Sequence, residues 1–87
     1  MNAQELIEQY LVEFNIERLL FKIVKEYKGT IDSSFGGRGY DLEFYHYDDA
    51  LAAWERLYWE LEGTRYHVQK RKPDRMPGGM YWFGVYK

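Results

Sequence analysis

Apolar residues recur at helical spacing in two runs near the start of the chain, residues 3–14 and residues 16–28. At 100° per residue the two apolar stripes point about 150° apart, so one straight helix could not bury both against a single surface. We therefore predict two helices with a break at Asn15, a residue able to cap both, and Gly29 as the end of the second. The stripe residues are Ala3, Leu6, Ile7, Tyr10, Leu11 and Phe14, then Ile16, Leu19, Leu20, Ile23, Val24 and Tyr27.

Residues 17–28 also admit a strand, because Leu19, Phe21 and Ile23 alternate with less apolar neighbours. The helical pattern accounts for more of the apolar positions in this segment and gives Gly29 a role. Both interpretations stay open, with the helix favoured.

The segment after Gly29 predicts a β-hairpin, with strands at 30–35 and 40–47 joined by a glycine-rich turn at 36–39. In the second strand the side chains alternate between an apolar and an acidic face, so we expect the acidic face to be solvated. The apolar face holds Tyr40, Leu42, Phe44 and His46, and the acidic face holds Asp41, Glu43, Tyr45 and Tyr47.

A third helix is predicted from a cap at Asp48 or Asp49 to about residue 62, where Gly63 ends it. Trp59 lies more than 100° from the centre of its apolar stripe, so core packing does not explain this large ring. The stripe consists of Ala50, Leu51, Trp54, Leu57, Tyr58 and Leu61.

The last segment predicts a second hairpin, with strand-like runs at 64–72 and 80–87 around the proline- and glycine-containing stretch KRKPDRMPGG at 70–79. The whole chain then forms a single α+β domain, residues 1–87, in the order α-α-β-β-α-β-β. We expect an antiparallel sheet of two hairpins with the helices covering one face.

The composition, with 46% hydrophobic and 30% charged residues, is that of a folded domain. The absence of cysteine excludes disulfides and thiolate metal sites and fits a reducing compartment. The first ten residues lack the positive charge of a signal peptide, and no apolar run approaches the roughly 20 residues that span a bilayer. We therefore expect a cytoplasmic protein with no membrane partner.

No arrangement of residues predicts catalysis, a metal site or a cofactor. Ser33 and Ser34 have no sequence feature linking them to His46 or His67, and the two histidines lack metal-ligand spacing. The GGRG glycines at 36–39 connect two strands rather than opening a helix, which favours a hairpin turn over a phosphate-binding loop. We therefore expect a protein that is not an enzyme, with no catalytic residues.

The charge is bipolar along the sequence, with residues 41–62 at net −6 and residues 65–87 at net +5, although the whole chain is at −2. Such asymmetry favours oriented association with charged surfaces. Our first hypothesis is a binding or inhibitor module with an acidic, aromatic surface formed by Glu43, Tyr45, Tyr47, Glu55, Trp59 and Glu62. The alternative is binding of single-stranded nucleic acid or RNA through Arg38, Lys70, Arg71, Lys72 and Arg75.

The stretch YHYDDALAAWERL, where a strand leads into a capped helix, together with small size, no cysteine and an acidic aromatic surface, resembles small phage-encoded inhibitors, including anti-CRISPR proteins. The resemblance covers about residues 40–62, and the basic final hairpin departs from strongly acidic DNA mimics. It implies an inhibitor whose partner is a protein or nucleoprotein complex. The oligomeric state stays open.

Overall fold

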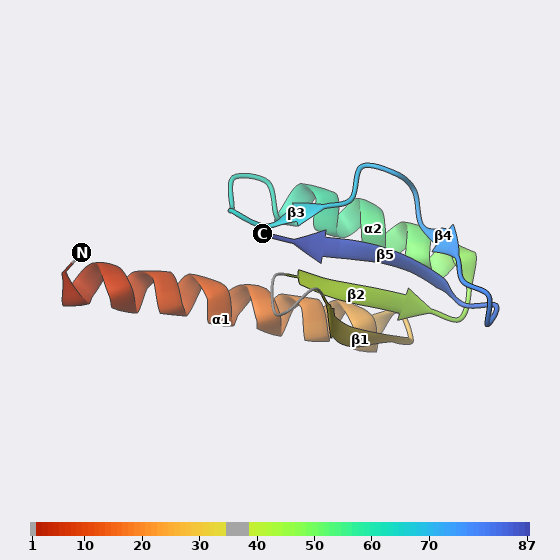
Figure 1. Ribbon diagram of the computed structural model, residues 1–87, viewed down its shortest axis with the longest axis horizontal. Coiled ribbons are helices and arrows are strands. Elements are labelled where there is room, and N and C mark those ends of the chain that lie inside the picture. The colour runs from red at the N-terminus through yellow and green to blue at the C-terminus, as the bar shows by residue number, and fades with distance from the viewer. Residues whose placement is uncertain (1, 35–38) are drawn as a thin grey trace.

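The structure is a computed structural model that describes residues 2–34 and 39–87 (Figure 1). It confirms an α+β domain with an antiparallel sheet. Its elements are α1 (Ala3–Glu26), β1 (Gly29–Ser34), β2 (Gly39–Phe44), α2 (Tyr47–Glu60), β3 (His67–Val68), β4 (Asp74–Arg75) and β5 (Tyr81–Tyr86).

The sheet has the strand order β1-β2-β5-β3, and β4 pairs with the same central strand, β5. In the register, Leu42 of β2 lies opposite Phe83 of β5, and Val68 of β3 lies opposite Val85. Arg75 of β4 lies opposite Tyr81, further along the same edge of β5. The strands β3 and β4 therefore form one edge strand that is interrupted between residues 69 and 73.

Both helices cover the same face of the sheet, with α1 against β1 and β2 and α2 against β5, β2 and β3 (Figure 1). The alternating pattern of β2 turns Leu42 and Phe44 into this layer, where both are fully buried. The Phe44 and Phe83 rings stack with centroids 5.7 Å apart. The core is completed by Ile16, Leu20, Ile23, Val24, Ala50, Ala53, Leu57, Leu61, Tyr66, Val68 and Val85.

The first two predicted helices form one continuous helix, α1, so the predicted break at Asn15 is wrong. No glycine or proline lies between residues 3 and 26 to interrupt the hydrogen-bond ladder. Asn2 caps the N-terminus, its Oδ1 accepting a 2.8 Å hydrogen bond from the Glu5 N–H. The helix interpretation of residues 17–28 is confirmed as far as Glu26. The N-terminal half of α1 projects beyond the sheet (Figure 1).

Gly29 begins β1 rather than ending a helix, because the chain turns at the two residues before it. Lys28 adopts a left-handed backbone with φ 58°. A Cβ on Gly29 would lie 2.6 Å from the Glu43 carbonyl oxygen and 2.6 Å from Cδ1 of Phe44. The glycine is therefore required by the close approach of β1 to β2.

The second predicted strand is shorter than expected, since β2 ends at Phe44 and Tyr47 already belongs to α2. The predicted cap at Asp48 or Asp49 is also wrong: His46 occupies the N-cap position, without a side-chain hydrogen bond. Both aspartates lie in the first helical turn, where their charge interacts favourably with the helix dipole.

The stretch at 70–79 is only partly the expected hairpin loop, because it contains β4. The reversal occurs at Met76–Met80, where the Met76 N–H donates to the Met80 carbonyl at 2.7 Å and the Gly79 N–H donates to the Met76 carbonyl at 2.9 Å. The basic residues 70–72 therefore lie beside the interrupted edge of the sheet and not at the hairpin tip.

The predicted turn residues Gly36, Gly37 and Arg38 lie outside the described residues. Across residues 2–34 and 39–87, no helix combines the length and apolar character needed to cross a bilayer.

Candidate protein-binding surface

The outward side of α2 carries the most exposed large apolar side chain of the described chain, Trp59, at 74% exposure. The opposite side of the helix buries Ala53 and Leu57 against the sheet. Glu55 precedes Trp59 by one helical turn, and Glu62 follows in the turn after the helix, both exposed. We call Glu55, Trp59 and Glu62 the α2 face.

A groove of about 450 Å³ adjoins the α2 face. It lies between the end of α2, the connection to β3, and the end of β5. Aromatic rings form much of its wall, and the Tyr86 ring lies 6.1 Å from that of His67. Its lining includes Tyr58, Trp59, Glu62, Tyr66, Lys70 and Tyr86. The groove can therefore accept an extended or side-chain-sized group beside the Trp59 ring.

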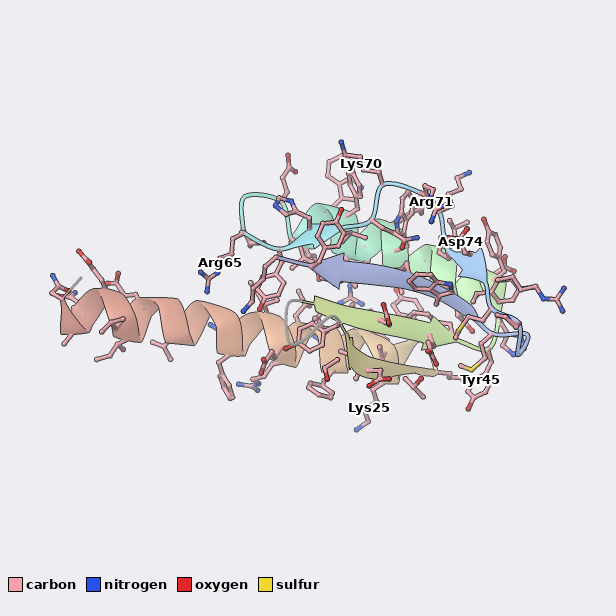
Figure 2. All side chains as sticks on the ribbon, viewed as in Figure 1. Lys25, Tyr45, Arg65, Lys70, Arg71 and Asp74 are labelled. Carbon is pink, nitrogen blue, oxygen red and sulfur yellow. The ribbon has the colours of Figure 1, made fainter. Side chains whose placement is uncertain are left out.

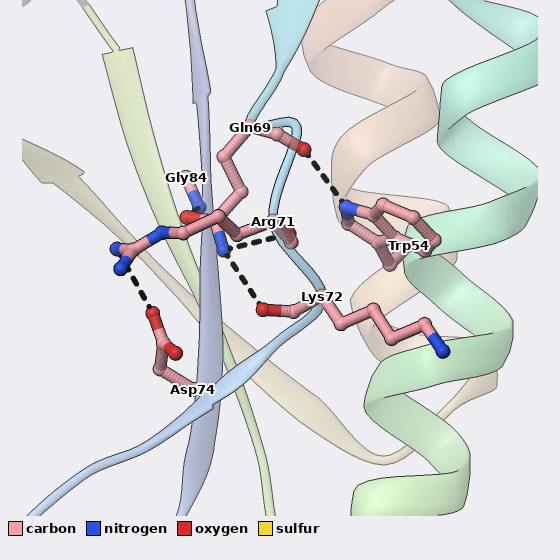
Figure 3. Close-up of polar contacts among 6 residues, drawn as sticks. All are labelled: Trp54, Gln69, Arg71, Lys72, Asp74 and Gly84. Carbon is pink, nitrogen blue, oxygen red and sulfur yellow. Dashed lines mark hydrogen bonds and ion pairs between the residues drawn. The ribbon is translucent and has the colours of Figure 1, made fainter.

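Next to Lys70, which lines the groove, a polar network surrounds Gln69, where β3 ends (Figure 3). The Gly84 N–H donates a 2.9 Å hydrogen bond to Gln69 Oε1 in place of a strand carbonyl. Gln69 Nε2 donates to the carbonyl oxygens of Arg71 at 3.1 Å and Lys72 at 3.4 Å. Trp54 Nε1 on α2 donates to the Gln69 carbonyl at 2.9 Å. These bonds fix residues 69–72 relative to α2.

A polar link also joins the two helices. Arg56 of α2 forms ion pairs with Glu26 of α1 and, at 3.4 Å, with Glu60 one turn later. Hydrogen bonds to Tyr27, Glu26 and Glu60 raise the pKa of Arg56 above its ordinary value, so the guanidinium stays charged. The one cation within the predicted acidic segment is thus directed toward α1 and Glu60, while Glu55 and Glu62 remain exposed.

The other three residues predicted for the acidic, aromatic surface lie elsewhere. Glu43 is on the sheet face opposite the helices, across from Trp82. Tyr45 is 61% exposed at the connection between β2 and α2, and Tyr47 packs edge-on against Tyr81 with centroids 5.4 Å apart. Because Tyr47 and Trp59 are twelve residues apart on one helix, they are about 18 Å apart along its axis. The structure does not bring the six residues into one surface.

Of the predicted basic residues, Lys70 and Arg71 lie along the interrupted edge (Figure 2). Arg71 pairs with Asp74, with Nη2 and Oδ2 3.1 Å apart. Lys72 extends to the α2 side of the edge, away from Arg71 (Figure 3), and Lys70 lines the groove. Arg75 is exposed on β4. Arg38, the remaining predicted contact, lies outside the described residues.

The two histidines lie at opposite ends of the sheet. His67 is opposite Tyr86, which in turn pairs with Gly39 at the start of β2, whereas His46 follows the other end of that strand. In the part of the chain that the structure describes, no group of three or more His, Cys, Asp or Glu side chains is placed to hold a metal ion.

Several groove residues were not predicted. Tyr58 belongs to the predicted core stripe of its helix but is half exposed, and its ring packs at a tilt against that of Trp54, with centroids 5.7 Å apart. Tyr66 and Tyr86 come from different elements, and no local pattern links them. Gln69 carries no sequence signal, since its role depends on the gap between β3 and β4. The position of Trp59 outside the apolar stripe of its helix is the sequence feature that indicates an exposed aromatic residue in this region.

Comparison of the chain with protein-family models, curated proteins and solved structures found no match in any of the three.

Proposed function

We propose that this chain is a non-enzymatic binding module that docks on a protein or nucleoprotein complex through the α2 face and the adjoining groove. The observation that carries the proposal is Trp59, which is 74% exposed beside a groove of about 450 Å³. Tryptophan is enriched among the residues that dominate binding energy at interfaces, because a rigid ring buries much area with little loss of conformational entropy. Trp59 acts as the central anchor.

The charge around the anchor defines the kind of partner. Glu55 and Glu62 flank Trp59, and the segment 41–62 carries a net charge of −6. A basic surface on the partner complements these carboxylates, which raises the association rate and selects against acidic partners. Lys70, which also lines the groove, adds a positive charge to the site. The combination of negative and positive charges fixes the orientation of the bound segment.

An inhibitor role of the anti-CRISPR kind is the specific form of this proposal that the sequence resemblance suggests. Its target would be a nucleoprotein complex, whose nucleic-acid groove offers the required basic surface. The α2 face would then occupy protein surface that normally contacts phosphates.

The experiment is affinity capture with the intact chain from cells of its natural environment, in parallel with the variants Trp59→Ala and Tyr45→Ala. Tyr45 is a matched control because it is also aromatic and exposed, but lies at the other end of α2. The proposal expects a partner that wild type and Tyr45→Ala retain and Trp59→Ala loses, before and after nuclease treatment. Equal capture by all three proteins would contradict docking through the α2 face.

Nucleic-acid binding is the second candidate function, favoured by the exposure of Lys70, Lys72 and Arg75 along one sheet edge. Cations there can neutralise phosphates, and binding would weaken steeply with salt. The ion pair of Arg71 with Asp74 weakens the case for this function, because it reduces the positive charge that is available to phosphates. A mobility shift with single-stranded DNA and RNA at low salt, compared with a variant carrying Ala at 70, 71, 72 and 75, tests it. Absence of any shift rejects this function.

A further inference from the structure

Helix α1 has a second apolar stripe that the sheet does not cover. Ile7, Leu11, Phe14 and Phe21 are all between 45% and 59% exposed, although they are large apolar side chains. The core stripe of the same helix points to the sheet with Ile16, Leu20, Ile23 and Val24. The stripe predicted at residues 16–28 is the one that packs on the sheet. Of the stripe predicted at residues 3–14, Leu6, Ile7, Leu11 and Phe14 are exposed, and Phe21 continues its direction along the helix.

The spacing of the exposed stripe is that of a helix packed along another helix. Its positions 7, 11, 14, 18 and 21 follow the alternation of four and three residues that characterises a coiled-coil seam. The polar member, Arg18, places its guanidinium 5.8 Å from the centre of the Phe14 ring. The seam therefore runs along most of α1, from the projecting half to the half that packs on the sheet.

This exposure is unfavourable in an isolated chain for two reasons. First, the projecting half is about twelve residues long, and helices of that length are marginal in water without tertiary packing. Second, the apolar side chains of the stripe expose on the order of 500 Å², which is at the upper end of what monomeric proteins leave open in one patch. A partner helix would remove both costs.

The charge along α1 identifies the partner as a second copy in the opposite direction. Residues 3–14 contain three glutamates and no basic residue, whereas residues 15–26 contain Arg18, Lys22 and Lys25 against two glutamates. Glu8 and Lys22 lie on the same flank of the seam, about 40° apart around the axis. An antiparallel copy centred near Phe14 brings each Glu8 within a turn of the other copy's Lys22. A parallel copy instead sets the acidic half of one helix beside the acidic half of the other.

We propose that the chain forms a twofold dimer through antiparallel pairing of the α1 seam. Such an interface is isologous, because each copy presents the same acidic and basic halves to the other. Two stripes together present on the order of 1,000 Å² of apolar surface, which is near the lower limit for a specific interface. The seam and the α2 face share no residue, so this inference does not rest on the proposed function.

The first test is the molar mass of the 87-residue chain in solution, measured by sedimentation equilibrium. Wild type is expected at twice the chain mass, and Leu11→Glu at one chain mass, because the new carboxylate lies in the middle of the seam. Tyr45→Glu is the matched control and should remain dimeric. Tryptophan fluorescence confirms folding of each variant, since Trp54, Trp59 and Trp82 all lie outside α1. A monomeric wild type, or a Leu11→Glu variant that remains dimeric, overturns the proposal.

The second test determines the direction of pairing by disulfide cross-linking. The chain has no native cysteine, so introduced cysteines can react only with one another. In the antiparallel dimer the two copies of residue 7 are roughly 20 Å apart, too far for a disulfide. Ile7→Cys alone should therefore not cross-link, whereas an equal mixture of Ile7→Cys and Phe21→Cys should give the mixed disulfide. Efficient cross-linking of Ile7→Cys to itself contradicts the antiparallel arrangement.

Discussion

The indole Nε1 of Trp54 on α2 donates a 2.9 Å hydrogen bond to the backbone carbonyl of Gln69, at the point where β3 ends. Through this bond and the side chain of Gln69, the helix is connected to the central strand β5 and to the backbone of residues 71 and 72. The basic segment 70–72 is therefore held in place beside α2, and Lys70 of this segment lines the groove.

Trp54→Phe should lower the free energy of unfolding by about 1 kcal/mol through the lost hydrogen bond, with a further loss from the smaller ring. Urea unfolding followed by circular dichroism measures the change. Trp59→Phe is the control, because its exposed ring predicts a change within about 0.5 kcal/mol. Equal effects at the two positions would show that Trp54 does not connect α2 to the sheet edge.

Tyr40→Phe should remove a link between β2 and α1, where the Tyr40 hydroxyl donates a 2.6 Å hydrogen bond to Glu17 Oε1. Burial raises the pKa of Tyr40 above its ordinary value, and the hydrogen bond to the Glu17 carboxylate raises it further. At neutral pH we expect the variant to be less stable by about 1 kcal/mol, since the bond is only partly buried.

The same pKa shift predicts a dependence on alkaline pH. The unfolded tyrosine ionises near pH 10, while the folded one keeps its proton, so wild type loses stability as the pH rises above that value. The stability difference between wild type and Tyr40→Phe should shrink between pH 9 and pH 11 in urea unfolding. A difference that stays constant would mean that Tyr40 titrates alike in both states.

Gly29→Ala should destabilise the protein by about 1–3 kcal/mol, because the new methyl group would overlap the Glu43 carbonyl oxygen and the Phe44 ring. Gly78→Ala is the matched control, since no heavy atom lies within 4 Å of its added Cβ. Thermal unfolding of the two variants gives the comparison. Similar melting temperatures for both would contradict the close packing of β1 on β2.

Much of the fold was predictable because local patterns determine it. Alternation in β2 identified Leu42 and Phe44 as core residues, and the α2 stripe identified Ala50, Leu57 and Leu61. The break at Asn15 was predicted wrongly from a correct observation. The two stripes of α1 do point in different directions, but nothing requires a helix to bury every apolar side chain within its own chain.

The interrupted edge strand and the groove could not be predicted from local patterns. Strand β4 has two residues, and its pairing depends on Gln69 filling the gap beside Gly84. The groove joins Tyr58, Tyr66 and Tyr86 from three separate segments. Of the six residues predicted for the surface, Glu55, Trp59 and Glu62 lie together on α2 and just after it. Glu43 and Tyr45 come before the helix, and Tyr47 is twelve residues from Trp59 along it.

The most direct test of the proposed function places a photo-reactive phenylalanine analogue at position 59, with the same analogue at position 45 as the control. After irradiation in cells of the protein's natural environment and nuclease treatment, adducts are identified by mass spectrometry. Docking through the α2 face predicts a covalent adduct with one protein partner from position 59 and none with that partner from position 45. Absence of a protein adduct at position 59, or the same adducts from both positions, would contradict it.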